Sequence, residues 1–198
     1  MSGRRQELSR LLELYRKGVI DEQALIDQMD ALGLKVGEDG EEAASQRPAV
    51  ESLVERLDRY RAAEASGAET LERWAELTGN SRLAGGLRVA AARERAHAQL
   101  LERRIGELGG QATAVVPDWL AGFNAALVDP EASDEQRLGA IVKQFPDPDA
   151  AVAPLRRFID SVSGDPMTQS LLLSICDDEQ TTVRWFHEEY ARITGTGS

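Results

Sequence analysis

The chain has 198 residues, of which 42% are hydrophobic and 29% charged, with 34 acidic side chains against 23 basic ones. The formal net charge of -11 argues against binding to nucleic acid, because contacts to phosphate need a basic surface. No stretch approaches the roughly 18 uncharged apolar residues of a transmembrane helix, and the first residues lack the apolar core of a signal peptide. A single cysteine, Cys176, excludes an internal disulfide framework, so we expect a cytoplasmic protein.

The composition favours helix over strand along the whole chain. Alanine, leucine, glutamate and arginine dominate, while aromatic residues make up only 5%. No run of residues alternates between polar and apolar side chains in the way of a half-buried strand. The sequence therefore predicts an all-α protein, long enough to bury a core of its own.

Residues 1–35 have the pattern of a short helical hairpin. Apolar side chains recur every three or four positions, Gly18 interrupts them, and Asp21 is placed to cap a second short helix. The segment resembles short oligomerisation modules. The matching positions are Leu12, Gly18, Ile20 and Leu32. The resemblance implies a homo-oligomer, or a protein partner bound through this hairpin; packing against the chain's own bundle is the other interpretation.

Residues 36–48 separate this hairpin from the rest of the chain. They contain four acidic residues, two glycines and a proline, with one apolar side chain larger than alanine. Such a composition is typical of a flexible linker. We therefore expect an acidic flexible linker at 36–48 and one further domain at 49–195.

This second domain carries the signals of a helical bundle. Long helices are expected at residues 49–77, 81–108, 149–162 and 167–193. Shorter helices are expected in between, one after Pro117 and one that begins with a capping box at Ser133. Two long hairpins joined by such a helical crossover make a four-helix bundle.

Two polar side chains interrupt the apolar stripe of the second long helix. The stripe runs in steps of three and four from Leu83 to Leu108, and Glu94 and His97 lie on it. A charged side chain is seldom buried without a partner, so this pair calls for a bound cation or a buried polar network. Glu64 interrupts the stripe of the first long helix, at the level of Glu94 in an antiparallel hairpin.

The fourth long helix repeats this pattern imperfectly. Glu179 and Thr182 lie on its stripe, and Thr182 takes the place that histidine has in the second helix. Counting back 30 residues from Glu179 leads to Asp149, the same separation as between Glu64 and Glu94. The sequence thus contains two similar helix pairs, of which the second lacks a histidine.

On these residues, segment 49–193 resembles the ferritin-like superfamily, and its helix-pair spacing is closest to the demethoxyubiquinone-hydroxylase-like members. The residues that carry the resemblance are Glu64, Glu94, His97, Leu101, Leu108, Gly109, Gly110, Asp178 and Glu179. The resemblance implies a ferritin-like four-helix bundle with a metal site. The implied metal ligands are Glu64, Glu94, His97 and Glu179, with Asp149 in place of the family's third-helix glutamate. Such an oxygen-rich site suits iron or manganese.

The incomplete ligand set leaves two functions open. In the preferred interpretation the bundle has lost full di-iron chemistry and serves a structural or protein-interaction role. The alternative is an iron- or manganese-binding protein that activates oxygen or oxidises iron. Glu94 and His97 could also form a metal-free network with Arg93, Arg95 or Tyr60. No residue is indicated as catalytic, and no motif for an organic cofactor is present.

Overall fold

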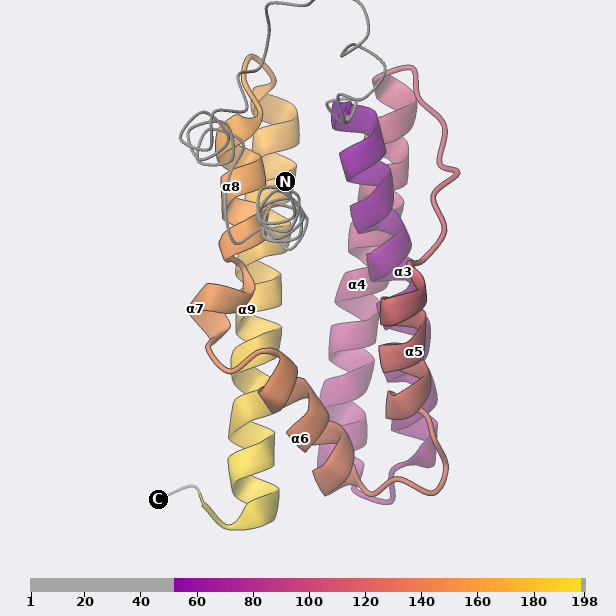
Figure 1. The fold of residues 1–198 in the computed structure, drawn as a ribbon, viewed down its shortest axis with the longest axis vertical. Coiled ribbons are helices and arrows are strands. Elements are labelled where there is room, and N and C mark those ends of the chain that lie inside the picture. The colour runs from indigo at the N-terminus through magenta and orange to yellow at the C-terminus, as the bar shows by residue number, and fades with distance from the viewer. Residues whose placement is uncertain (1–51, 197–198) are drawn as a thin grey trace, which may run out of the picture. The chain divides into compact units, whose positions relative to one another are not determined.

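The computed structural model describes residues 52–196, and within them the chain forms helices only. The helices are α3 (Leu53–Leu77), α4 (Ser81–Glu107), α5 (Asp118–Leu127), α6 (Asp134–Gln144), α7 (Pro148–Ala151), α8 (Ala153–Ser161) and α9 (Pro166–Thr194) (Figure 1). The prediction of an all-α protein is confirmed for this part of the chain. The predicted hairpin at 1–35 and the predicted linker at 36–48 lie outside the described residues. None of the described helices combines the length and the apolar character that crossing a membrane requires.

Helices α3 and α4 form a long antiparallel hairpin (Figure 1). α3 begins after Ser52 rather than at Ala49, because the Ser52 side chain accepts the backbone N–H of Glu55 while Glu55 accepts that of Ser52. Asn80 caps α4 in a similar way, accepting the backbone N–H groups of Arg82 and Leu83. The turn between the helices is therefore fixed by local hydrogen bonds, which sets the levels at which their side chains meet.

The predicted third long helix is two helices, α7 and α8, which break at Val152. Pro154 explains the break, since its ring has no N–H to donate and clashes with the carbonyl one turn earlier. The prediction of one helix over 149–162 was therefore wrong. α7 and α8 both pack against α9, so a second, shorter hairpin lies beside the first one (Figure 1).

The connection between the two hairpins is itself helical. α5 packs against α3, and α6 crosses to α9 (Figure 1). The N-terminus of α6 is held to the end of α3 by Asp134, whose carboxylate accepts hydrogen bonds from Trp74 Nε1 at 2.8 Å and Thr78 Oγ1 at 2.5 Å. The capping box predicted at Ser133 is confirmed. These contacts fix the crossover against the first hairpin.

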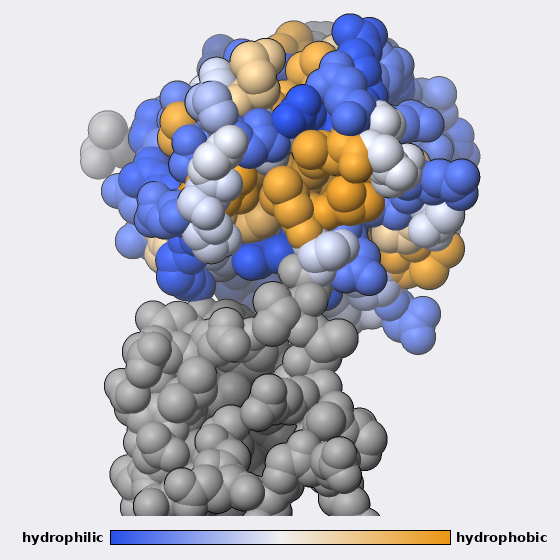
Figure 2. Space-filling model, turned by 90° about the horizontal axis from the view of Figure 1, so that it is seen from above, coloured by the Kyte–Doolittle hydropathy of each residue, from blue (hydrophilic) through white to orange (hydrophobic). Residues whose placement is uncertain are grey.

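The interior contains two hydrophobic clusters at different levels. One gathers around Trp74, Leu87 and Phe186, and the other around Leu57, Leu101 and Phe158. Figure 2 views the molecule from the end at which α3 begins, where apolar residues gather inside a ring of hydrophilic ones. Between the two clusters, α3, α4 and α9 carry buried or half-buried polar side chains. These side chains form a polar layer, and its members are Glu64, Glu94, His97, Asp178, Glu179 and Thr182.

Candidate metal centre

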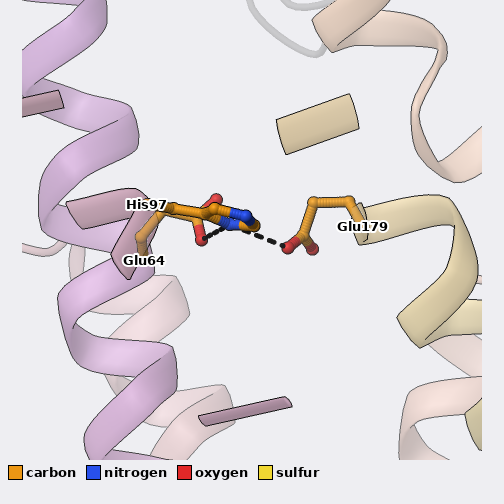
Figure 3. Close-up of side chains that lie close together, drawn as sticks. All are labelled: Glu64, His97 and Glu179. Atoms are coloured by element: carbon orange, nitrogen blue, oxygen red, sulfur yellow. Dashed lines mark hydrogen bonds and ion pairs between the residues drawn. The ribbon is translucent and has the colours of Figure 1, made fainter. Parts of the chain in front are cut away.

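Three side chains of the polar layer point toward one another (Figure 3). Glu64 comes from α3, His97 from α4 and Glu179 from α9, so each of the three long helices contributes one residue. A ligand atom from each lies within 4.8 Å of the others, and among the described residues this is the one such group of three. Glu64 and His97 are buried, and the Glu179 side chain is 29% exposed.

His97 is the centre of this group. Its Nδ1 lies 3.0 Å from Glu64 Oε2 and 3.8 Å from Glu179 Oε1. Its Nε2 lies 3.1 Å from Asp178 Oδ2. We assign Nε2–H as the donor to Asp178, which leaves Nδ1 facing two carboxylates. A proton or another cation must then lie between Nδ1 and Glu64, because two acceptors do not bond to each other.

The electrostatics of the layer favour a positive charge. Burial opposes a charge on His97, but the hydrogen bond and the charge of Glu64, helped by Asp178 and Glu179, outweigh it and raise the pKa of the imidazole. Burial, together with the charge of Glu64, raises the pKa of Glu179 to about 8. Within residues 52–196, the one guanidinium that forms an ion pair with this layer is that of Arg93, which lies 3.7 Å from Asp178 on the more exposed side. Among the described residues of the polar layer, acidic side chains therefore outnumber the cationic groups that could pair with them.

Glu94 belongs to the layer but not to the group of three. Burial, then the charges of Glu179 and Glu64, raise the pKa of Glu94 well above its usual range. Its carboxylate lies against the backbone of α3 at Gly67, where a Cβ would come within 2.0 Å of Glu94 Oε2. Within residues 52–196 no hydrogen bond or ion pair satisfies this carboxylate.

The remaining predicted residues lie apart from the group. Thr182 is buried beside Glu179, so the side chain that replaces the second histidine does point inside. Asp149 is exposed on the four-residue α7 and accepts a hydrogen bond from Gln180. Because Pro154 breaks the helix, Asp149 does not share a stripe with the buried residues of α8, and the structure does not bring it to the other acids.

The residues fit a divalent ion in both distance and chemistry. Two ligands that bind the same ion at about 2.1 Å lie roughly 3.0–3.5 Å apart when adjacent. The separation between His97 Nδ1 and Glu64 meets this directly, whereas Glu179, at 3.8 Å from Nδ1, would have to move closer. Asp178 holds the other ring nitrogen, as the outer carboxylate of a metal-bound histidine usually does.

No ligand role was predicted for Asp178, although it is one of the residues that carry the resemblance to the ferritin-like superfamily. The apolar stripe of α9 could not reveal it, since Asp178 lies at the edge of that stripe and meets His97 only through the packing of α4 on α9. The other histidine, His187, contacts the carbonyl oxygen of Phe145 at 2.7 Å and lies outside the group.

A cavity of about 330 Å³ adjoins the polar layer. Its walls come from α3, α5, α6, α7, α8 and α9, with Glu94 as the contribution of α4. Most of its lining is apolar, and its polar lining side chains include Glu64, Glu94, Glu179, Thr182, Thr70 and Asn124. The crossover helices therefore border a partly open space directly beside the candidate ligands.

No protein family, curated protein or solved structure matches this chain. Its function therefore has to be inferred from the geometry and charge of the polar layer and of the cavity beside it.

Proposed function

We propose that this chain is a ferritin-like helical bundle that holds one divalent metal ion, iron or manganese, through Glu64, His97 and Glu179. The convergence of these three side chains from three helices is the observation that carries the proposal. The two helical hairpins with their helical crossover, and the carboxylates on their apolar stripes, support the ferritin-like assignment.

One ion, rather than a pair, follows from the ligands that the chain offers. Thr182 has no imidazole, and Asp149 is exposed on α7. Glu94 lies beside Gly67 without a second nitrogen ligand. A pair of ions would need donors on this side of the layer that the described residues do not supply. The polar layer thus offers three ligands for one ion around His97, but too few for a second ion beside Glu94.

The role that fits this arrangement best is structural. Bound there, a divalent ion would supply positive charge at the centre of the acidic layer. Glu64 and His97 would hold it from the first hairpin and Glu179 from the second, so its binding would tie the two hairpins together. A partner bound through residues 1–35 would extend this role to protein interaction.

A catalytic role is the second candidate, and the cavity favours it. Because Glu64 and Glu179 line that space, a small molecule inside it would lie next to the ion. An oxygen-activating or iron-oxidising site needs such access and a surrounding that excludes water. The chain's own residues would then orient the substrate.

Metal content tests the proposal. Protein treated with a chelator is dialysed against Mn²⁺, or against Fe²⁺ without oxygen, and its bound metal is measured by mass spectrometry. We expect one ion per chain, lost in His97→Ala and in Glu64→Ala. Asp149→Asn and Glu94→Gln should retain the ion, since neither residue belongs to the group of three. Equal metal content in wild type and His97→Ala would refute the proposal, and two ions per chain would favour the catalytic alternative.

A further inference from the structure

The cavity beside the polar layer has a chemical character of its own. Its apolar walls include the aromatic rings of Tyr60, Trp119, Phe123, Phe145 and Phe186. Its volume of about 330 Å³ lies within the range of small-molecule sites. Such a space accommodates a small ring or a short alkyl chain.

All formal charges that line the cavity are negative. The ionisable groups among its lining residues are Glu64, Glu94, Glu179 and the hydroxyl of Tyr60, and no lysine, arginine or histidine is among these described residues. An anionic ligand would meet three acidic side chains and no cation among these lining residues, and burial would strengthen the repulsion from those that are ionised. A cationic ligand would instead be attracted by these acidic side chains.

Glu94 is the carboxylate that this environment leaves without a partner. His97 lies between Glu64 and Asp178, and its Nδ1 is the nearest cationic group to Glu179. Glu94 has no such neighbour, and Gly67 holds it at the wall of the cavity. Desolvation and the neighbouring acids raise the pKa of Glu94, so an ammonium group supplied from the cavity would stabilise its ionised form.

Trp119 adds a second sign of ligand binding. Its side chain is 66% exposed, although it is the largest apolar side chain of α5, and it also lines the cavity. An indole in this position borders both solvent and the interior of the cavity. It could contact an apolar body or a cation that enters, since both bind well to an indole face.

We propose that this cavity binds a small organic amine in its protonated form, with Glu94 as the counter-ion and the aromatic walls around an aryl or alkyl body. The ammonium group would donate hydrogen bonds to the Glu94 carboxylate, which receives none from the described residues, and Glu94 would release its own proton to solvent as the amine binds. This inference does not require the metal ion, because the ion's three proposed ligands do not include Glu94.

The test uses three probes of similar shape and different charge: 2-phenylethylamine, 2-phenylethanol and phenylacetate. Binding to the full chain is measured by titration calorimetry at pH 7, where the amine is charged. The protein is first treated with a chelator, so that the result is independent of metal content. We expect the amine to bind roughly ten- to a hundredfold more tightly than the alcohol, the range for a hydrogen bond to a charged group. Phenylacetate should bind most weakly.

Variants assign the preference to Glu94. Glu94→Gln should reduce amine affinity to that of the alcohol and leave alcohol binding unchanged. Glu188→Gln, which removes one exposed charge from α9, should change neither. Glu94→Asp keeps the charge but moves the carboxylate away from the cavity, because its side chain is one methylene shorter. This variant is used instead of Glu94→Gln if the latter does not fold. Ala63→Phe should abolish binding of all three probes, since it fills the cavity.

Three results would overturn the inference. They are an amine that binds no better than the alcohol, a Glu94→Gln variant that retains amine affinity, and the absence of measurable binding by all three probes. Metal binding is measured separately by dialysis, so a failure of this inference and a failure of the metal proposal can be told apart.

Discussion

Asp178 Oδ2 lies 3.1 Å from Nε2 of His97 and so accepts a hydrogen bond from the ring nitrogen that does not face Glu64. A carboxylate in this position fixes the tautomer and the orientation of a metal-binding imidazole. We therefore expect Asp178→Ala to weaken metal binding by about 10- to 100-fold, the usual effect of losing such a partner. Asp177→Ala removes the same charge from the neighbouring exposed position and should leave the affinity nearly unchanged. Equal affinities in the two variants would show that Asp178 does not position the ring.

Thr182 is buried three residues after Glu179, where a histidine would complete the second Glu-x-x-His pair. We expect Thr182→His to raise the metal content from one ion to two ions per chain, with Glu94 and Glu179 as neighbouring carboxylates. Thr181→His places the same side chain on the exposed face and should not add an ion. A Thr182→His protein that folds and still binds one ion would mean that the absent histidine is not what limits the site.

The stability of the metal-free protein should depend on pH through Glu179. The folded state raises the pKa of this carboxyl from 4.5 to about 8, so between these values the folded chain binds more protons than the unfolded chain. The free energy of unfolding should therefore fall as pH rises from about 4.5 to about 8. His97 acts in the same direction, because its pKa is also raised and the stability it contributes is lost as pH rises through that pKa.

Urea unfolding at a series of pH values measures this slope. Glu179→Gln should reduce the slope, since the amide does not ionise, but leave the part due to His97 and Glu94, whose pKa values are also raised. Saturation of the wild-type protein with metal should also reduce the slope, because the ion replaces protons. A metal-free protein whose stability rises steadily between pH 5 and pH 8 would contradict the charge distribution described here.

Gly67 allows the Glu94 carboxylate to lie against α3. A glycine within a helix normally costs about 1 kcal/mol relative to alanine, so Gly85→Ala, with nothing near its added Cβ, should stabilise the protein by about that amount. Gly67→Ala should gain less, because its Cβ would lie 2.0 Å from Glu94 Oε2 and the carboxylate must move. In a Glu94→Ala background the full gain should return, and thermal unfolding of this double-mutant cycle measures the difference. Identical gains at the two glycines would show that Glu94 does not occupy this position.

The sequence allowed the helices to be predicted where local signals decide their ends. The helix predicted from residue 81 begins there, and the helix predicted to begin with a capping box at Ser133 does so. The segment at 149–162 was predicted as one helix because its apolar stripe was given more weight than Pro154, which breaks it. Here a single backbone constraint prevails over side-chain periodicity.

The candidate site was predictable only to the extent that it follows from periodicity. Glu64, His97 and Glu179 meet because each interrupts the apolar stripe of its own helix, and stripes face one another in a bundle. The contact of Asp178 with His97 depends on the rotation of α9 against α4, which no single helix encodes. The cavity depends on how α5 and α6 cross the hairpins, and the sequence carries no comparable signal for that placement.

The most direct test of the central claim is the position of the metal. Crystals of the full chain grown with Mn²⁺ would give an anomalous difference map that locates the ion without reference to any structure of the site. We expect one peak per chain in the polar layer, about 2.0–2.3 Å from His97 Nδ1 and from an oxygen of Glu64 and of Glu179. A map without a peak there, with His97 Nδ1 still bonded to Glu64, would contradict the claim that these three residues form a metal site.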